Sequence, residues 1–316
     1  MRGAGLRFLG VPAGKWRRYF DLRNLVDVFI TLAGFIVSLF VVLIFWPNQV
    51  FIKGGYVGIP VGLAAGILRR PIILHESDSV MGMANRILAH LASRICVSFP
   101  LDSYQLPDSI KKKMVYTGVP INDVFYSKEL GSLDISFKED KPIVLIMGGS
   151  QGARIINQTV KEALPQILEK YQVVHLAGGL DYPALKSDLN QLNNLDYHLF
   201  DFLPNTQVAS LMKKSAVIIS RAGATAIAEI AAVNKPAILI PLKGSANNHQ
   251  YYNAQYLNQK EAAVIIEQDN LTPQLLTDSI DKIVQSDLGR RLSFNISGLM
   301  QKGAAEKITK ILLNRI

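Results

Sequence analysis

Short apolar runs alternate with longer amphipathic stretches from Val50 onward. VFIKGG is followed by VGLAAGIL, PIILHE by MANRILAHLA, and RICVSF by a polar stretch that ends at MVYTG. The apolar runs have the length of buried strands, and the stretches that follow them are typical of helices. This alternation predicts a parallel sheet covered by helices, which defines an α/β domain.

The same pattern restarts after residues 127–141, a polar segment without periodicity that is typical of a linker. The second set of predicted strands is PIVLIMGG, QVVHLAGG, SAVIIS, PAILIPL and AAVIIEQ, and the predicted helices are ARIINQTVKEALPQIL, GATAIAEIAAV, NHQYYNAQYL and PQLLTDSIDKIV. We therefore predict an N-terminal domain at residues 1–134 and a C-terminal domain at residues 135–316. We expect the last helix of the chain to pack back on the first domain.

The first domain is predicted to be incomplete. A doubly wound nucleotide-binding domain opens with a strand, a glycine turn and a helix. The residues before Val50 supply one clear helix candidate instead. The predicted fold class is α/β, with two Rossmann-like doubly wound domains, of which the first lacks its opening strand, loop and helix.

The stretch before this alternation is apolar enough to concern a membrane. Asp27 and Lys53 enclose 25 uncharged residues, which is long enough for a single span at about residues 28–46. The six basic residues before the stretch would hold the N-terminus in the cytoplasm and send the rest of the chain outside. A buried or interface-lying helix that ends at Pro47 is therefore favoured, with a span as the alternative. A signal peptide is disfavoured, because no small-residue cleavage site follows.

Positive charge is concentrated in the first part of the chain. The 316 residues carry a net charge of +9, and residues 1–70 hold nine Lys or Arg against two Asp. Such a field attracts an anionic membrane surface or a phosphorylated substrate. No nucleic-acid partner is expected, because the sequence has no helix-turn-helix, zinc-ligand or aromatic-basic motif. The single cysteine, Cys96, lies in an apolar run, which predicts a buried structural thiol and a reducing cytoplasm.

A glycine-rich segment, GGSQGAR, directly follows the predicted strand IVLIM and opens a helix. Glycines let backbone N–H groups approach a phosphate, and a helix N-terminus adds about half a positive charge. Ser150, Gln151 and Gly152 are therefore candidate phosphate-binding residues, with a glycine turn used only for packing as the alternative. The spacing differs from G-x-G-x-x-G, which argues against a dehydrogenase.

A second small-residue segment, SRAGAT, also follows a strand and precedes a helix. Gly223, Ala224 and Thr225 leave backbone amides accessible to a nucleotide, and Arg221 lies beside them. Glu229 lies further along the helix, where its carboxylate can accept two hydrogen bonds from ribose hydroxyls. The alternative for Glu229 is a favourable interaction with the helix N-terminal dipole.

A third segment, NNHQYYN, follows the strand PAILIPL. His249 and Asn253 lie four residues apart and share a helix face, with Gln250 alongside. These three side chains can reach a sugar. The alternative is an ordinary polar start of a helix.

Two polar segments end strands of the first domain. Gly54-Gly55-Tyr56 ends one, and His75-Glu76-Ser77-Asp78 ends the next. Open α/β sheets hold ligands at the carboxyl ends of their strands. A His75–Glu76 pair there can move a proton or bind a polar acceptor, since histidine titrates near neutrality. A structural histidine explains His75 equally well.

These segments together resemble the ordered motif set of the MurG glycosyltransferases. The matching stretches are GGYVGIPVGLAA, ILHESDSVMGMANRILA, YTGVP, MGGSQGAR, ISRAGATAIAEIAA, KPAILIPL and NHQYYNA, collinear from about residue 8 to about residue 270. The resemblance implies the two-domain GT-B fold and an inverting transfer of N-acetylglucosamine without a cofactor or metal. The donor is UDP-N-acetylglucosamine, and the acceptor is undecaprenyl-pyrophosphoryl-N-acetylmuramoyl-pentapeptide, so that lipid I becomes lipid II.

The resemblance also implies a cellular role and a location. Peptidoglycan synthesis links the protein to cell-wall biogenesis, cell shape and cell division, with cell-wall synthesis and division proteins as expected partners. The expected place is the cytoplasmic face of the cell membrane, as a peripheral protein.

Carried over position by position, the resemblance implies a role for each motif. It places Ser150 at the donor diphosphate, Arg221, Thr225, Glu229 and Leu203 around the uridine, Gln250, His249 and Asn253 at the sugar, and Tyr56 with the HESD stretch on the acceptor side.

Three departures from the family pattern bear on activity. The family opens with a strand and a GTGGH-type loop, whose histidine is proposed as the general base, and this chain begins after that loop. The TGNP-x-R motif reads TGVPIN, so that Val119 and Asn122 replace an asparagine and an arginine. Asp78 replaces an asparagine and would repel a pyrophosphate. His75 with Glu76 is then the best candidate base. The alternatives are a catalytically impaired homologue that binds UDP-sugar as a scaffold, or another UDP-sugar enzyme, such as a glycolipid synthase or 2-epimerase.

Overall fold

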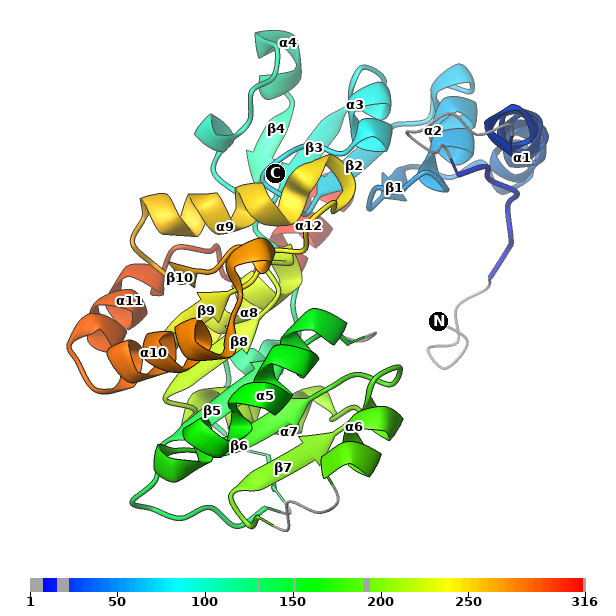
Figure 1. Ribbon diagram of the computed structural model, residues 1–316. Helices are drawn as coiled ribbons and strands as arrows, with labels where there is room; N and C mark the ends of the chain where they lie inside the picture. Colours follow the sequence, from blue (N-terminus) through cyan, green and yellow to red (C-terminus); the bar gives the residue numbers. More distant parts are fainter. Residues whose placement is uncertain are drawn as a thin grey trace. The chain divides into compact units, whose positions relative to one another are not determined.

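The computed structural model describes residues 8–15, 23–129, 131–133, 135–149, 152–189 and 194–314 (Figure 1). The described chain forms two compact units. Unit 1 contains the residues up to Thr117 together with those from Glu306 onward, and unit 2 contains Gly118–Ala305. The domain boundary that the polar linker suggests, at residue 134, stays a prediction.

Unit 1 is built on a parallel sheet whose four strands follow one another in chain order. The segment PIILHE gives a strand that is buried at all five positions, as its continuous apolar run predicts. Helices α2 Gly58–Ile67 and α3 Met83–Ala89 connect the first three strands. The strands are β1 Val50–Ile52, β2 Ile72–Glu76, β3 Arg94–Val97 and β4 Met114–Tyr116.

The end of the chain returns to unit 1. Helix α12 Ala304–Leu312 places Ile308 and Ile311 against Ile73 of β2 and Cys96 of β3 in one apolar cluster. Burial raises the pKa of the Cys96 thiol to about 11. A thiol with this pKa is un-ionised at neutral pH, which agrees with the structural role expected for it.

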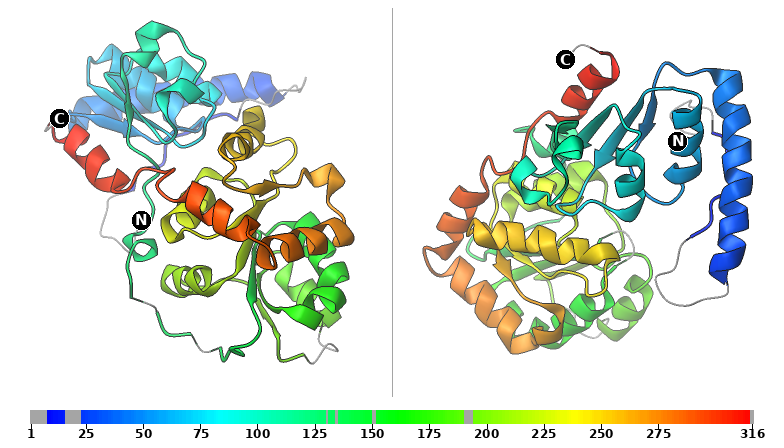
Figure 2. Two further views of the ribbon diagram at one scale, coloured as in Figure 1. Left: turned by 90° about the vertical axis from the view of Figure 1, so that its left-hand side faces the viewer. Right: turned by 90° about the horizontal axis from the view of Figure 1, so that it is seen from above.

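The apolar N-terminal stretch forms one helix, α1 Arg23–Phe45, which packs along α2 (Figure 2). Only 17% of the residues in its most apolar window are buried. Of the expected buried or interface-lying helix, the buried form is therefore wrong, because α1 packs on α2 and leaves large apolar side chains exposed. An interface-lying helix and a span both fit this exposure, and α1 has the length and composition to cross a membrane.

Unit 2 contains a parallel sheet with the strand order β10-β9-β8-β5-β6-β7. From β5 the chain adds strands in one direction, then returns to β8 on the other side of β5 and adds strands in the opposite direction. The order therefore reverses between β5 and β8, where doubly wound sheets hold ligands. The strands are β5 Ile143–Met147, β6 Gln172–Leu176, β7 Tyr197–Phe200, β8 Val217–Ser220, β9 Ala237–Leu239 and β10 Val264–Ile265.

Helices cover both faces of this sheet. Ile156 and Val160 of α5 and Ile280 of α10 pack with Val144 and Ile219 of the sheet in one buried cluster. Helices α7 and α8 lie on the opposite face (Figures 1 and 2). The main helices are α5 Arg154–Lys170, α6 Tyr182–Leu189, α7 Asn205–Lys214, α8 Ala224–Val233, α9 His249–Gln259, α10 Pro273–Val284 and α11 Leu288–Ile296.

Candidate functional site

Two of the sequence-predicted segments meet at the point where the sheet of unit 2 reverses its strand order. Met147, the last residue of β5, pairs with Ser220, the last residue of β8. GGSQGAR therefore starts beside RAGAT, and both segments lead into the N-terminus of a helix. Two helix N-termini at one sheet edge make a favourable place for an anion.

The glycine loop after β5 adopts a conformation that only glycine accommodates well. Gly149 and Gly152 have φ of +83° and +85°, and the N–H of Gly152 donates to the carbonyl of Gly149 at 2.9 Å. A Cβ at Gly152 would lie 2.4 Å from the carbonyl oxygen of Ala177. Ser150 and Gln151, the other predicted residues of this loop, lie outside the described residues.

The loop after β8 is fixed by Arg221. Its Nη1 donates to the carbonyl of Ile240 at 3.2 Å, which ties this loop to the end of β9. Burial lowers the pKa of Arg221, but a guanidinium stays charged in proteins. Gly223 is the N-cap of α8, and no side chain among the described residues caps the helix, so the amides of its first turn are available to a ligand. Ala224 is buried behind this turn, and Thr225 is exposed on it.

Glu229 lies further along α8 as a largely buried carboxyl. Desolvation raises the pKa of Glu229 to about 7. Within the part of the chain that the structure describes, no hydrogen bond or ion pair compensates its charge. A carboxylate in this setting gains most from a ligand that donates hydrogen bonds, which is what a ribose diol does.

The three predicted residues at the start of α9, His249, Gln250 and Asn253, have different environments. Asn253 is fully buried and its Nδ2 donates to the carbonyl of Ala222 at 3.1 Å, so it supports the RAGAT loop. Gln250 accepts a hydrogen bond from the N–H of Leu242 at 3.0 Å through Oε1. Among the described residues, no hydrogen bond engages its Nε2, which is therefore available as a donor to a ligand. His249 is half-buried one position before it.

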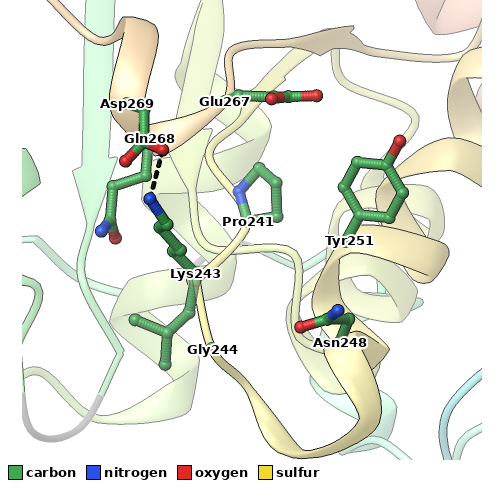
Figure 3. Close-up of a pocket in the computed structure, with 9 residues that line it drawn as sticks. Pro241, Lys243, Gly244, Asn248, Tyr251, Glu267, Gln268 and Asp269 are labelled. Atoms are coloured by element: carbon green, nitrogen blue, oxygen red, sulfur yellow. Dashed lines mark hydrogen bonds and ion pairs between the residues drawn. The ribbon is translucent and has the colours of Figure 1, made fainter.

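A cavity of about 240 Å³ is lined by the loop after β9, the start of α9 and the turn after β10 (Figure 3). Tyr251 and Glu267 face it, and Lys243 pairs with Asp269 at its rim. The ionised groups among its described lining residues are two carboxylates and one ammonium, so a negatively charged diphosphate is disfavoured there. The helix N-termini at β5 and β8 suit the diphosphate better.

The polar strand ends of unit 1 are tightly engaged in its own structure. His75 is fully buried, with Ser77 Oγ 3.4 Å from Nδ1 and Ser98 Oγ 3.5 Å from Nε2. Tyr56, after the two positive-φ residues Gly54 and Gly55, is 42% exposed. Among the side chains at these strand ends, that of Tyr56 is exposed to solvent, whereas those of His75 and Ser98 are buried.

Glu76 organises the loop between β2 and α3. Its Oε2 accepts from the N–H of Gly82 at 2.8 Å and from Nδ2 of Asn85 at 2.9 Å, and its Oε1 accepts from the N–H of Asp78 at 3.2 Å. Burial raises the pKa of Glu76. A carboxylate with three protein donors is arranged to hold a loop rather than to take a substrate proton.

The remaining predicted residues have local structural contacts. Asp78 accepts a hydrogen bond from the Tyr104 hydroxyl through its backbone carbonyl at 2.9 Å. Asn122 belongs to unit 2, where Oδ1 accepts from the N–H of Val124 at 3.1 Å and caps the 3₁₀ turn Asp123–Phe125. Leu203 is half-buried and directly precedes Pro204, the N-cap of α7.

The chain matches two domains of a known protein family. The glycosyltransferase family 28 C-terminal domain matches residues 143–303, and the N-terminal domain of the same family matches residues 1–97. The chain belongs to glycosyltransferase family 28. The matches cover the switch point and its loops as well as the HESD strand end.

Relatives of this family 28 glycosyltransferase share a long and specific name. UDP-N-acetylglucosamine–N-acetylmuramyl-(pentapeptide) pyrophosphoryl-undecaprenol N-acetylglucosamine transferase 2 of Bacillus cereus is 35% identical over 288 residues, covering 90% of this chain and 79% of the relative. The transferase of Clostridium kluyveri that carries the same name without the final numeral is 34% identical over 315 residues, covering 98% and 85%.

Solved structures share its two-domain architecture. The crystal structure of Acinetobacter baumannii MurG has a TM-score of 0.74 at 24% identity, covering 94% of this chain and 82% of that one. The co-structure of S. aureus MnaA with UDP has a TM-score of 0.64 at 16% identity, covering 95% and 85%. Family 28 domains and these structures together establish the GT-B fold.

Sequence reasoning missed two buried residues of this glycosyltransferase, Asn157 and His175. Asn157 lies in the first turns of α5 and His175 lies within β6, and they share a hydrogen bond of 2.9 Å. A polar residue inside the apolar run QVVHL was the available signal. Its partner could not be found from the sequence, because the two residues are 18 positions apart.

Proposed function

We propose that this protein transfers N-acetylglucosamine from UDP-N-acetylglucosamine to undecaprenyl-pyrophosphoryl-N-acetylmuramoyl-pentapeptide in peptidoglycan synthesis. One observation carries the proposal: relatives that are named for this transfer are 34–37% identical to the chain and match 85–98% of it. The family 28 domains agree with a glycosyltransferase.

The donor is proposed to bind at the switch point of unit 2. The open first turn of α8, the N-terminal end of α5 and the Arg221 guanidinium supply positive potential for the diphosphate. When the acceptor oxygen attacks the sugar carbon, the bond to UDP breaks and negative charge grows on the leaving phosphate. Fixed donors aimed at this charge stabilise the transition state.

Uridine and sugar are proposed to contact different groups. Glu229 accepts hydrogen bonds from the ribose hydroxyls, and Leu203 and Thr225 border the base. Gln250 donates to a sugar hydroxyl through Nε2, because Leu242 already occupies its Oε1. His249 lies alongside, whereas Asn253 acts by holding the Ala222 carbonyl.

The acceptor is proposed to use unit 1. Tyr56 offers an exposed ring and hydroxyl, and the loop from Ser77 to Gly82 offers a polar edge held by Glu76. We assign His75 and Glu76 the role of supporting this edge, since neither is arranged for proton transfer.

Association with the cytoplasmic face of the membrane is also proposed. Helix α1 exposes Phe29, Phe40 and Ile44 by 63%, 61% and 77%. Basic residues lie on the same unit, among them Arg70, whose guanidinium is 4.3 Å from the Trp46 ring centroid. An apolar helix beside cationic side chains suits an anionic lipid surface, where the undecaprenyl acceptor is located.

The test is an assay of the purified protein with radiolabelled UDP-N-acetylglucosamine and a short-chain lipid acceptor. The expected product is the disaccharide-linked lipid, with UDP released in equal amount. Donor binding without product would instead support the scaffold alternative. UDP-N-acetylmannosamine formed without acceptor would support a 2-epimerase, and transfer to a diacylglycerol acceptor would support a glycolipid synthase.

A further inference from the structure

A network of buried and partly buried hydrogen bonds runs from β7 through β6 to α5 and ends next to Gly152 of the glycine loop. The Tyr197 hydroxyl is 3.1 Å from Nδ1 of His175, and Nε2 of His175 is 2.9 Å from Oδ1 of Asn157. Nδ2 of Asn157 donates to the carbonyl of Ala177 at 3.0 Å and to Oδ2 of Asp181 at 2.8 Å. His175 and Asn157 are 0% and 1% exposed, so water does not replace these contacts.

The donor and the acceptor of each hydrogen bond in this network can be assigned. The Ala177 carbonyl only accepts, which assigns the donor nitrogen of Asn157 to that side and leaves Oδ1 as the acceptor for His175. Burial lowers the pKa of His175 to about 3, so the imidazole is neutral at working pH. A neutral ring has one donor and one acceptor; His175 therefore carries its proton on Nε2 and accepts from Tyr197 at Nδ1.

The Ala177 and Asp181 end of this hydrogen-bond network lies against Gly152 of the glycine loop. A Cβ on Gly152 would lie 2.4 Å from the Ala177 carbonyl oxygen and 3.3 Å from Oδ2 of Asp181, the two atoms to which Asn157 donates. The N–H of Asn157 also donates to the carbonyl of Ala153 at 2.9 Å, within the first turn of α5. Asn157 thus fixes both the start of α5 and the wall against which the loop packs.

We propose that His175 and Asn157 are positioning residues for the donor diphosphate: His175 orients the Asn157 amide, which holds Gly152 and the first turn of α5 at the required distance from the phosphates. This inference rests on the proposed function, because it assigns the diphosphate to this loop. Neither side chain touches the ligand. Loss of this hydrogen-bond network is expected to weaken contacts to the phosphates and to leave contacts to uridine unchanged.

The experiment compares the binding of UDP with that of uridine, which lacks the phosphates. His175→Phe keeps a planar ring and removes both hydrogen bonds, and Asn157→Leu keeps the approximate side-chain volume. We expect each variant to bind UDP about ten- to a hundredfold more weakly, the scale set by one hydrogen bond to a charged group. Uridine affinity is expected to stay within twofold (roughly 0.4 kcal/mol) of the wild type.

His198→Phe is the matched control, because His198 is a half-buried histidine on the neighbouring strand and takes no part in the network. It is expected to leave both affinities unchanged. Equal weakening of UDP and uridine in the His175 and Asn157 variants, or no weakening of either, overturns the inference. A wild type that binds neither compound overturns the proposed function instead.

A second measurement tests the network in the unaltered protein. Nitrogen-15 spectra of the histidine rings are expected to show His175 neutral, with its proton on Nε2, from pH 5 to pH 9. This result does not depend on the stability of any variant. A ring that titrates in this range, or that carries its proton on Nδ1, overturns the orientation on which the proposal depends. His175→Gln, which retains a donor for Asn157, is expected to recover part of the UDP affinity.

Discussion

Glu229 couples donor binding to pH at the scale of a single residue. Burial raises its pKa to about 7, so the group is largely protonated at pH 6 and largely ionised at pH 8. Only the ionised form offers full acceptor strength to a ribose diol. We therefore expect the Kd for UDP to fall by up to about tenfold between pH 6 and pH 8. Titration calorimetry across this range measures it, and Glu229→Gln is expected to flatten the dependence.

The Glu229 carboxyl also makes stability depend on pH, in the opposite direction from donor binding. Its folded pKa of about 7 exceeds the ordinary 4.5, so the folded state binds the proton more tightly than the unfolded state. The contribution of Glu229 to stability is therefore greatest below pH 4.5 and declines as pH rises towards 7. Glu229→Gln is expected to raise the melting temperature at pH 8 and to leave it unchanged at pH 4. An unchanged melting temperature at pH 8 contradicts the burial argument.

Gly152 and Gly223 form a natural pair for a test of the two loops. Gly152 has a φ of +85° and a Cβ there would meet the Ala177 carbonyl at 2.4 Å, whereas Gly223 has a φ of −71° and open space around its Cβ position. Gly152→Ala is expected to lower the free energy of unfolding by about 1–3 kcal/mol, because a side chain is strained at this φ. Gly223→Ala is expected to leave it unchanged. Denaturant unfolding measures both, and equal stabilities contradict the assigned strain.

At the scale of elements, Glu76 supports the loop from Ser77 to Gly82. Glu76→Gln replaces an acceptor that receives three hydrogen bonds by a group that also donates. We expect faster hydrogen exchange at the Asp78 and Gly82 amides, a higher KM for the lipid acceptor and an unchanged KM for UDP-N-acetylglucosamine. Asp102→Asn, at an exposed position of the same unit, is the control. A loss of kcat alone, without faster exchange, supports proton transfer by Glu76 instead.

Helix α1 provides a second prediction at this scale. Its exposed apolar side chains insert into a lipid surface only if the helix lies at the membrane. Phe40→Glu with Ile44→Glu is expected to abolish flotation of the protein with vesicles that contain anionic lipid. Phe294→Glu changes a side chain that is 81% exposed in unit 2 and is expected to have no effect. Flotation that survives the α1 changes contradicts the proposed membrane contact.

Helices and strands with a clear local pattern could be predicted from the sequence, and those without one could not. PQLLTDSIDKIV has a proline at its first turn and a clear apolar stripe, and it forms α10 over the predicted residues. YHLF carries no such signal, because β7 is an edge strand and half-buried at all four positions, so it was missed. The sequence left open whether α1 is buried, interface-lying or a span, since hydropathy gives the length of an apolar helix but not what covers it, and the structure excludes the buried form.

The site followed a similar rule. RAGAT and GGSQGAR were found because a strand, small residues and a helix start are local in the sequence, and the fold then placed them side by side at the reversal of strand order. The uses of Glu76 and Asn253 depend on partners nine and 31 residues away, Asn85 and Ala222. Such pairings are set by packing and cannot be derived from local spacing. The predicted roles of the ligand-facing residues stay predictions.

At the scale of the whole molecule, the division into two units predicts how the protein responds to its donor. All residues proposed to contact UDP lie in unit 2. The free energy of UDP binding is therefore added to the stability of that unit. At a concentration of one hundred times Kd, a ligand stabilises the folded state by about 2.7 kcal/mol, which raises the melting temperature of a unit of this size by several degrees. Calorimetry is expected to show two transitions, of which UDP shifts one. If UDP shifts a single transition of the whole chain, the two units unfold together and the donor stabilises both. An absence of any shift removes the switch point as the nucleotide site, whatever the acceptor proves to be.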